Sequence, residues 1–252
     1  RDAQESRGLG DVYKRQAAER EAEGIRKAGG EAIAVQANVL DKESLKKAHD
    51  VVLEKFGPCE VLINGAGGNN PKGTTTSEYF SKEDMLDKNA RSFFDLDQDG
   101  VSFVFNLNFL GTLLTTQAFA TDMLETGGCI VNISSMNAFT PLTKIPAYSG
   151  AKAAVSNFTQ WLAVHFANCN IRVNAIAPGF FATNQNRTLL FNEDGSLTPR
   201  SHKIISQTPM GRFGEPEELR GTLRFLIDND ASGFVTGITI PVDGGFSAYS
   251  GV

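Results

Sequence analysis

The sequence has few cysteines and no long apolar run. Its 252 residues include Cys59, Cys129 and Cys169, whose spacing matches neither a metal-ligand pattern nor a paired disulfide framework. No uninterrupted apolar stretch reaches the length that crosses a membrane, and no secretory signal is recognisable. We therefore expect reduced thiols, no metal site and a cytoplasmic location.

Positive charge is also in slight deficit. The chain has 24 lysines and arginines against 29 aspartates and glutamates, which gives a net charge of −5. A mildly acidic balance is atypical of a nucleic-acid-binding surface. With 41% apolar residues, the composition suits one α/β domain with a large core. We expect neither nucleic acid nor a membrane as a partner.

The first sixteen residues lack an apolar strand. Arg7-Gly8-Leu9-Gly10 has glycines like those of a phosphate-cradling loop, but such a loop follows a buried strand and opens a helix. The polar residues 1–6 cannot form that strand. We interpret residues 1–16 as unrelated to the domain over 17–252, and residues 8–16 are similar to translated sequencing-adapter sequence.

Apolar, β-branched runs alternate with helical patterns along the rest of the chain, as in a parallel sheet covered by helices. Strands are predicted over 32–39, 61–67, 127–133, 171–179 and 235–245. Helices are predicted over 17–28, 42–56 and 101–123, and again from Tyr148 to Phe166. The long polar stretch 68–100 predicts either a cap over a site or a surface insertion.

Side chains suited to proton transfer follow the strand predicted at 127–133. Ser135 lies on the loop that leaves this strand, and Tyr148 and Lys152 stand four residues apart on one face of the next helix. An adjacent ammonium stabilises a phenolate, so we expect Lys152 to lower the pKa of Tyr148 and make it a general acid or base. Ser135 would hydrogen-bond the oxygen that gains or loses charge. The pattern indicates carbonyl–alcohol chemistry, although an ordinary strand and helix could contain it by chance.

The serine and the Tyr-x-x-x-Lys pattern resemble the signature of the short-chain dehydrogenase/reductase family. The resemblance covers residues 17–252 and implies a doubly wound, Rossmann-like parallel sheet, an NAD(P) cofactor and a homotetramer. The family's usual gap of thirteen residues between serine and tyrosine favours Ser135, with Ser134 as the alternative. The resemblance also implies that Asn108 holds a relay water, with Asn106 as the competing choice.

The same resemblance implies the cofactor site. Residues 64–67 match the family's Asn-x-Ala-Gly, residues 178–183 match its Pro-Gly-x-x-x-Thr beside the nicotinamide, and Asn38 replaces its usual Asp beside the adenine. The expected cofactor contacts are Asn38, Val39, Asn64, Gly65, Ala66, Gly67, Tyr148, Lys152, Pro178, Gly179 and Thr183.

Three elements of the family pattern have no recognisable counterpart before residue 17: the first strand, its glycine loop and the second strand. A strand–helix–strand unit of roughly 40 residues would hold them. Because that loop holds the pyrophosphate, we expect weak cofactor binding by this chain. We expect NAD and leave NADP open, since the residue that separates them belongs to this unit.

Within the family a closer resemblance is to the D-mannonate oxidoreductases, also called fructuronate reductases. Segments 65–71, 105–112, 134–139 and 244–252 carry it, and it implies reduction of the keto-hexuronate D-fructuronate to D-mannonate. The amide-rich run 184–187 suits a hydroxylated substrate. Candidate substrate contacts are Asn69, Asn70, Asn137, Lys144 and Arg187, the last two as carboxylate receptors.

Two other interpretations stay open. The chain could reduce another sugar, a polyol or a 3-oxoacyl substrate, as other members of the family do. It could also be a non-catalytic remnant that keeps its catalytic residues but has lost its cofactor site.

Overall fold

A parallel four-stranded sheet forms the centre of the protein. The computed structural model describes residues 16–183 and 186–251. The strands are β1 (Val61–Asn64), β2 (Gly128–Ile133), β3 (Ile171–Pro178) and β4 (Thr239–Val242), and they lie side by side in this order. All three pairings are parallel. The predicted α/β class with a parallel sheet is confirmed.

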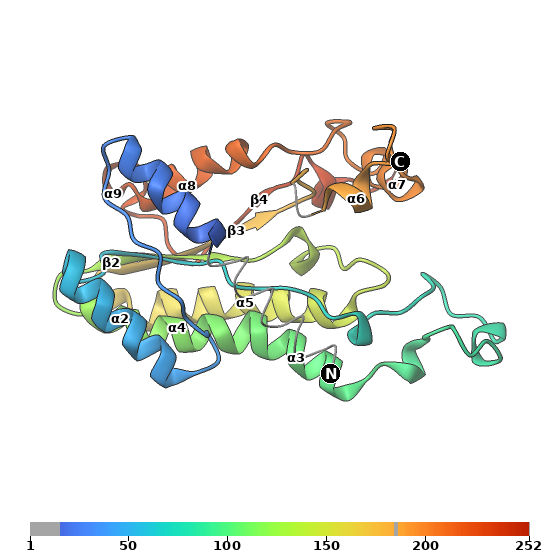
Figure 1. Cartoon of the computed structure of the whole chain (residues 1–252), viewed down its shortest axis with the longest axis horizontal. Helices are drawn as coiled ribbons and strands as arrows, with labels where there is room; N and C mark the ends of the chain where they lie inside the picture. Colours follow the sequence, from blue (N-terminus) through green and yellow to red (C-terminus); the bar gives the residue numbers. More distant parts are fainter. Residues whose placement is uncertain (1–15, 184–185, 252) are drawn as a thin grey trace.

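Helices cover both faces of this sheet (Figure 1). One layer contains α2 (Lys42–Phe56), α3 (Gln98–Phe105), α4 (Gly111–Phe119) and α5 (Pro146–His165). The other contains α8 (Leu219–Ile227), α9 (Asn229–Ser232) and a helix over residues 16–27. The helices predicted over 17–28 and 42–56 are therefore confirmed.

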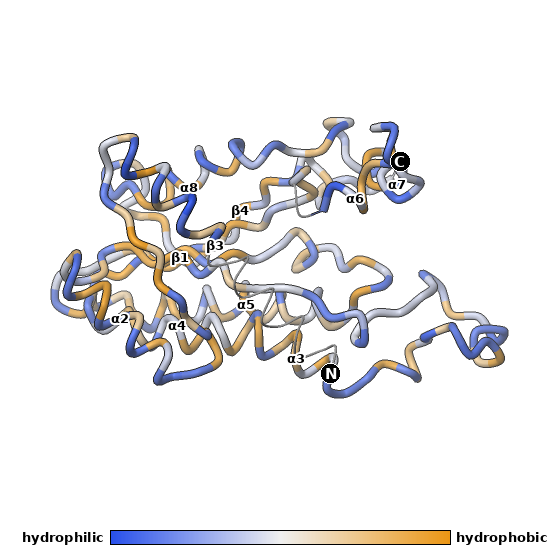
Figure 2. The backbone as a smooth tube through the Cα atoms, viewed as in Figure 1, coloured by the Kyte–Doolittle hydropathy of each residue, from blue (hydrophilic) through white to orange (hydrophobic). Residues whose placement is uncertain are grey.

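The two layers have separate cores because successive strand residues point to opposite faces. Ile130 packs with Leu62, Leu162 and Val173 in the first layer. Its neighbour Val131 packs with Leu226 of α8 in the second. Figure 2 shows the apolar residues gathered along the strands, whereas polar and apolar residues alternate along α2.

The strand predicted over 32–39 is wrong. These residues form an unpaired connection between the helix over 16–27 and α2. A strand needs a hydrogen-bonded neighbour, and in the described part of the chain the outer edge of β1 pairs with none. The end of the segment instead turns into α2: Leu40 N–H donates to Oδ1 of Asn38 (3.0 Å), and Asn38 N–H donates to Oγ of Ser44 (2.9 Å).

The long helix predicted over 101–123 begins at Gln98 and is interrupted. After α3 the chain widens into a π-helical turn, η4 (Asn106–Leu110), before α4 continues to Phe119 and the 3₁₀ turn η5 (Ala120–Met123) ends the segment. Such π-turns occur frequently at functional sites. Asn108, a predicted site residue, lies in this turn.

Residues 68–97 form an arm that projects from the sheet's carboxyl end (Figure 1). It contains only short 3₁₀ turns: η1 (Pro71–Gly73), η2 (Glu83–Met85) and η3 (Phe93–Asp95). Phe93 and Phe94 are 70% and 68% exposed and pack edge-to-face on each other. These aromatic side chains therefore do not anchor the arm in the core, which favours the surface-insertion interpretation.

Short elements complete the chain: η6 (Met136–Ala138), η7 (Ala167–Cys169), α6 (Arg187–Leu190), α7 (Pro199–Ser206), η8 (Pro216–Glu218) and η9 (Phe246–Ala248). Among the described residues, no helix is both long and apolar enough to cross a membrane. The glycines of residues 7–10, and Asn184 and Gln185 of the amide-rich run, lie outside the described residues.

Candidate active site

The predicted catalytic residues meet where β2 ends and α5 begins. Ser135 follows β2 by two residues and caps η6, accepting a hydrogen bond from Asn137 N–H (3.2 Å). Pro146 occupies the first turn of α5, where its fixed φ favours helix initiation, so Tyr148 and Lys152 fall in the first two turns. Ligands of open parallel sheets bind at the carboxyl ends of the strands, and these residues are at that edge.

The structure favours Ser135 over Ser134 as the residue facing Tyr148. The Ser135 side chain faces the Tyr148 hydroxyl and lowers its pKa, opposing the effect of burial. The Ser134 hydroxyl instead lies 3.1 Å from the carbonyl oxygen of Lys152 and 2.7 Å from Oγ of Ser156. Ser134 is therefore turned toward α5, away from the position that a reacting carbonyl would take.

The predicted effect of Lys152 on Tyr148 is wrong for this structure. Burial raises the pKa of the Tyr148 hydroxyl above its usual value, and the hydrogen bond with Ser135 offsets only part of that rise. The Lys152 ammonium lies 5.7 Å from the centre of the tyrosine ring. Burial also lowers the pKa of Lys152, to about 8. Desolvation dominates both shifts because both side chains sit inside the protein.

Lys152 and Asn108 converge on one glycine. Lys152 is 4% exposed, and its Nζ donates to the carbonyl of Ile133 (2.7 Å). Asn108 is fully buried and donates to the carbonyls of Gly68 (2.7 Å) and Val104 (2.8 Å). A methyl group added at Gly67 would lie 2.6 Å from Oδ1 of Asn108 and 3.2 Å from Nζ of Lys152.

The competing choice, Asn106, is exposed on the helix surface. Only Asn108 of the two amides reaches the residues around Lys152. Its role in holding a relay water stays a prediction.

The expected cofactor contacts line the carboxyl ends of two strands that flank β2. Gly65, Ala66 and Gly67 follow β1 and are exposed, so that a ligand can approach their backbone closely. Pro178 ends β3, and Gly179 packs so tightly that an added methyl would lie 2.6 Å from Cα of Asp243.

The remaining expected contacts have local roles. Asn64 lies inside the sheet and donates to Asn132 (2.9 Å). Thr183 is exposed, and its N–H donates to Oδ1 of Asn186 (2.8 Å). Val39 lies against Gly111 at the start of α4, while the Asn38 carbonyl oxygen Oδ1 is engaged in the turn into α2.

The candidate substrate contacts separate into three groups. Asn137 is buried two residues after Ser135. Lys144 joins the serine–tyrosine loop to the arm, because its carbonyl accepts a hydrogen bond from Thr75 N–H (2.9 Å). The other three are engaged elsewhere: Asn69 donates to Thr74 (3.2 Å), Asn70 caps η1, and the guanidinium of Arg187 lies 5.4 Å from the centre of the Phe191 ring.

An ion pair that joins the arm to α7 has no recognisable signal in the sequence. Lys203 of α7 hydrogen-bonds the carboxylate of Glu78 in the arm, and these residues are 125 positions apart. Together with Lys144, Lys203 lowers the pKa of Glu78. No spacing rule connects positions so distant, so only the fold reveals that the arm and α7 meet.

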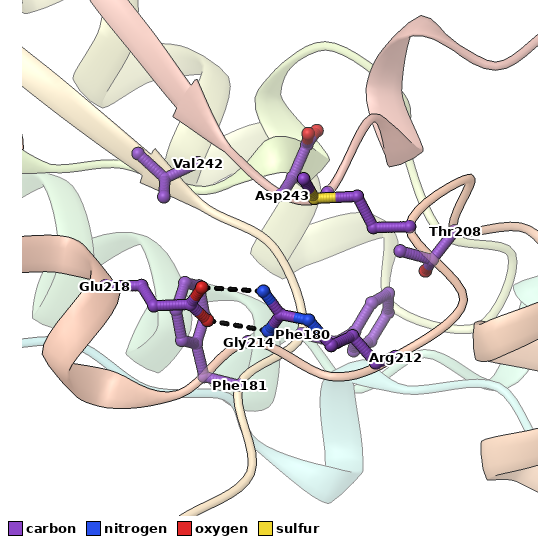
Figure 3. A pocket seen from close by; sticks show the side chains of 10 residues that line it. Phe180, Phe181, Thr208, Arg212, Gly214, Glu218, Val242 and Asp243 are labelled. Atoms are coloured by element: carbon purple, nitrogen blue, oxygen red, sulfur yellow. Dashed lines mark hydrogen bonds and ion pairs between the residues drawn. The ribbon is translucent and has the colours of Figure 1, made fainter.

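A cavity of about 250 Å³ is lined in part by the segment that follows Pro178. Its lining includes Phe180, Phe181, Met210, Arg212, Glu218 and Asp243 (Figure 3). Arg212 spans it and donates two hydrogen bonds of 2.7 Å to the Glu218 carboxylate. Ser135, Tyr148 and Lys152 do not line this cavity, so it is not the centre of the predicted chemistry.

Known proteins with similar sequences are oxidoreductases. Residues 9–247 match the family model described as enoyl-(acyl carrier protein) reductase. An uncharacterized oxidoreductase of Haemophilus influenzae is 60% identical over 94% of this chain and 83% of its own length. The uncharacterized oxidoreductase UxuB of Bacillus subtilis is 55% identical over 90% of this chain and 81% of its own length.

A solved structure is similar over the same range. It is a protein from Haemophilus influenza with bound NAD, for which D-mannonate oxidoreductase activity has been proposed. It is 59% identical with a TM-score of 0.89, and the match covers 94% of this chain and 85% of that one. With its parallel sheet and the Ser135, Tyr148 and Lys152 arrangement at the strand ends, this chain belongs to the short-chain dehydrogenase/reductase family.

Proposed function

We propose that this protein is an NAD-dependent reductase of a keto-hexuronate, converting D-fructuronate to D-mannonate. The observation that carries the reaction type is that Ser135, Tyr148 and buried Lys152 converge at the end of β2, with the Lys152 amine 2.7 Å from the Ile133 carbonyl and 5.7 Å from the centre of the Tyr148 ring. The similarity to the NAD-bound Haemophilus protein supports the substrate and the cofactor.

The described residues fit the nicotinamide end of the cofactor. Exposed Gly65, Ala66 and Gly67 leave backbone open at the end of β1, and Pro178 and Gly179 form a tight turn at the end of β3. Tyr148 and Lys152 lie between these strand ends and would contact the ribose. Residues 16–183 and 186–251 contain no glycine-rich strand-to-helix turn beside the outer edge of β1, where the pyrophosphate would bind.

Each catalytic residue would have one task in ketone reduction. When bound, NADH supplies the hydride to the carbonyl carbon. Ser135 donates a hydrogen bond to the carbonyl oxygen, and Tyr148 gives its proton to the alkoxide as that oxygen gains charge. The raised pKa of Tyr148 keeps that proton in place at neutral pH. Lys152 and Asn108 would return a proton to Tyr148 through a bound water.

Polar groups near Tyr148 support a hydroxylated, acidic substrate. Asn137 places a buried amide two residues from Ser135, and Lys144 brings a cation to the loop that precedes Tyr148. Arg187, whose guanidinium lies over Phe191, is the second candidate receptor for the substrate carboxylate. We also propose a homotetramer, which light scattering after size exclusion would measure.

Two measurements test the proposal. The first is NADH titration by fluorescence, on this chain and on a version with the strand–loop–helix–strand unit of the Haemophilus relative joined before residue 17. Binding only by the extended version would favour the alternative that this chain is a non-catalytic remnant without a cofactor site. The second is NADH oxidation with D-fructuronate, a neutral ketose or a 3-oxoacyl thioester, together with NAD+ reduction by a polyol. Preference for any of these alternatives would overturn the hexuronate assignment while keeping the reductase chemistry.

A further inference from the structure

Ser134 is fixed to three elements of the fold at once. It is 2% exposed and follows β2 directly. Its backbone N–H donates to the carbonyl of Ile176 in β3 (2.8 Å). Its hydroxyl reaches α5, where it lies 3.1 Å from the carbonyl oxygen of Lys152 and 2.7 Å from Oγ of Ser156. The start of the catalytic loop is therefore tied both to the sheet and to the helix.

The two hydroxyls can satisfy both contacts only in one arrangement. The Lys152 carbonyl has no proton to give, so Ser134 must donate to it. The proton between the two hydroxyls then comes from Ser156, which donates to Oγ of Ser134. Each hydroxyl thus uses its single proton.

These bonds hold Lys152 at both ends. Ser134 binds its backbone carbonyl, and the carbonyl of Ile133, the residue before Ser134, accepts a hydrogen bond from its Nζ (2.7 Å). The residue after Ser134 is Ser135, whose side chain faces the Tyr148 hydroxyl. Three consecutive residues, 133–135, therefore contact the two catalytic residues of α5.

We propose that Ser134 is a positioning residue, whose bond to the Lys152 carbonyl sets α5 against the catalytic loop and keeps the lysine amine beside Ile133. The inference rests on the proposed function for its effect on turnover, but its effect on Lys152 is independent of any substrate. Ser134 touches neither substrate nor cofactor and acts through Lys152. Ser134→Ala breaks this buried hydrogen bond and removes the acceptor of the Ser156 hydroxyl, which loosens a site more than losing an unpaired hydroxyl does.

The chain offers a matched control in the same helix. Ser149 is buried in α5, three residues before Lys152, and its hydroxyl has no hydrogen-bond partner. Ser149→Ala removes the same atom as Ser134→Ala without breaking a bond. Ser156→Ala is intermediate, because it removes the second hydroxyl while Ser134 still donates to the Lys152 carbonyl.

The test is competitive acetylation of the folded protein between pH 6 and 10, with the Lys152-containing peptide quantified by mass spectrometry. Ser134→Ala should raise the limiting rate constant for acetylation of the unprotonated Lys152 amine, obtained from the high-pH plateau, about three- to tenfold, Ser156→Ala less, and Ser149→Ala not at all. The titration midpoint of Lys152 should move from about 8 toward 10.5 in Ser134→Ala as the amine gains solvent. Circular dichroism verifies that each variant is folded. If Ser134→Ala does not fold, Ser156→Ala is compared with Ser149→Ala in its place.

Ketone reduction provides the second readout. Ser134→Ala should lower kcat about tenfold while KM for the ketone stays within about twofold, because the reacting groups move and the substrate contacts remain. A Lys152 profile in Ser134→Ala that superimposes on that of Ser149→Ala would overturn the positioning role. A changed profile in a protein that reduces no ketone would leave the positioning role standing and reject the proposed function.

Discussion

The Nζ of Lys152 lies 2.7 Å from the carbonyl oxygen of Ile133, with the amine turned into the protein. The same burial that lowers the pKa of Lys152 to about 8 raises that of Tyr148. The acid of the proposed reaction therefore keeps its proton through the neutral range, whereas the lysine begins to lose its own near pH 8. At neutral pH the tyrosine is therefore in the protonated form, which is the form that ketone reduction needs.

The rate of ketone reduction should fall as the pH rises above about 8. Lys152 loses its proton first and Tyr148 follows at higher pH, so the proton supply to the alkoxide fails on the alkaline side. The pH profile of kcat under saturating NADH measures this. A rate that increases steadily from pH 7 to pH 10 would contradict the assignment of Tyr148 as the acid.

Lys152→Met should raise the free energy of unfolding near pH 7. The pKa of Lys152 is about 8 in the folded protein and 10.5 ordinarily, so the unfolded chain binds the proton more tightly. At neutral pH this difference lowers the free energy of unfolding of the wild-type protein. That penalty, at most about 3 kcal/mol, disappears as the pH rises from 8 to 10.5. Urea unfolding at pH 7 and pH 10 should therefore show an advantage that shrinks at high pH. Lys88→Met, at an exposed arm position, is the control and should show no pH-dependent difference.

Gly67→Ala should destabilise the fold and displace the Asn108 amide. The added methyl would lie 2.6 Å from Oδ1 of Asn108. The amide cannot move freely, because Nδ2 donates to the carbonyls of Gly68 and Val104 and Oδ1 accepts from Gly68 N–H. We expect a loss of about 1–3 kcal/mol in the free energy of unfolding. Gly65→Ala is the control for stability, because its methyl would meet nothing closer than 4.0 Å. Equal unfolding midpoints for the two variants would contradict the packing around Asn108.

Glu78→Gln should loosen the arm and α7 without unfolding the protein. The carboxylate pairs with Lys203 and is the contact that joins these two segments across the sheet's carboxyl end. Such partly exposed pairs contribute at most about 1 kcal/mol to global stability. Hydrogen exchange should therefore accelerate only in residues 74–97 and 199–206. The control Asp50→Asn breaks the ion pair with Lys46 within α2 and should leave hydrogen exchange in both segments unchanged. Wild-type exchange rates in both segments of Glu78→Gln would contradict the prediction and show that other contacts hold the arm against α7.

The sequence predicts that Ser135, Tyr148 and Lys152 lie close together, and it can do so because their arrangement is local. Tyr148 and Lys152 are one helical turn apart, and Ser135 lies two residues after the end of β2, so spacing along the chain brings them together. The family's spacing favours Ser135 over Ser134, and the structure supports that choice, since both side chains are buried but the Ser134 hydroxyl is bound to the Lys152 carbonyl. The pKa of Tyr148 was mispredicted because spacing reports neighbouring charges and not desolvation.

Non-local features were the least predictable. Residues 32–39 have the composition of a strand, but pairing decides whether a strand forms, and no described residue pairs with them. The π-turn at Asn106–Leu110 and the ion pair between Glu78 and Lys203 left no recognisable pattern in the sequence. Both depend on packing between segments that are distant along the chain.

The most direct test is the rate of NADH oxidation with D-fructuronate by the wild-type chain and by Tyr148→Phe, with Tyr79→Phe as the control on the exposed arm. Removing only the Tyr148 hydroxyl should lower kcat about 10²- to 10⁴-fold, as expected for loss of a general acid, with an unchanged unfolding midpoint. Tyr79→Phe should retain wild-type turnover. Near-normal fructuronate reduction by Tyr148→Phe would contradict the central claim that this hydroxyl donates the proton.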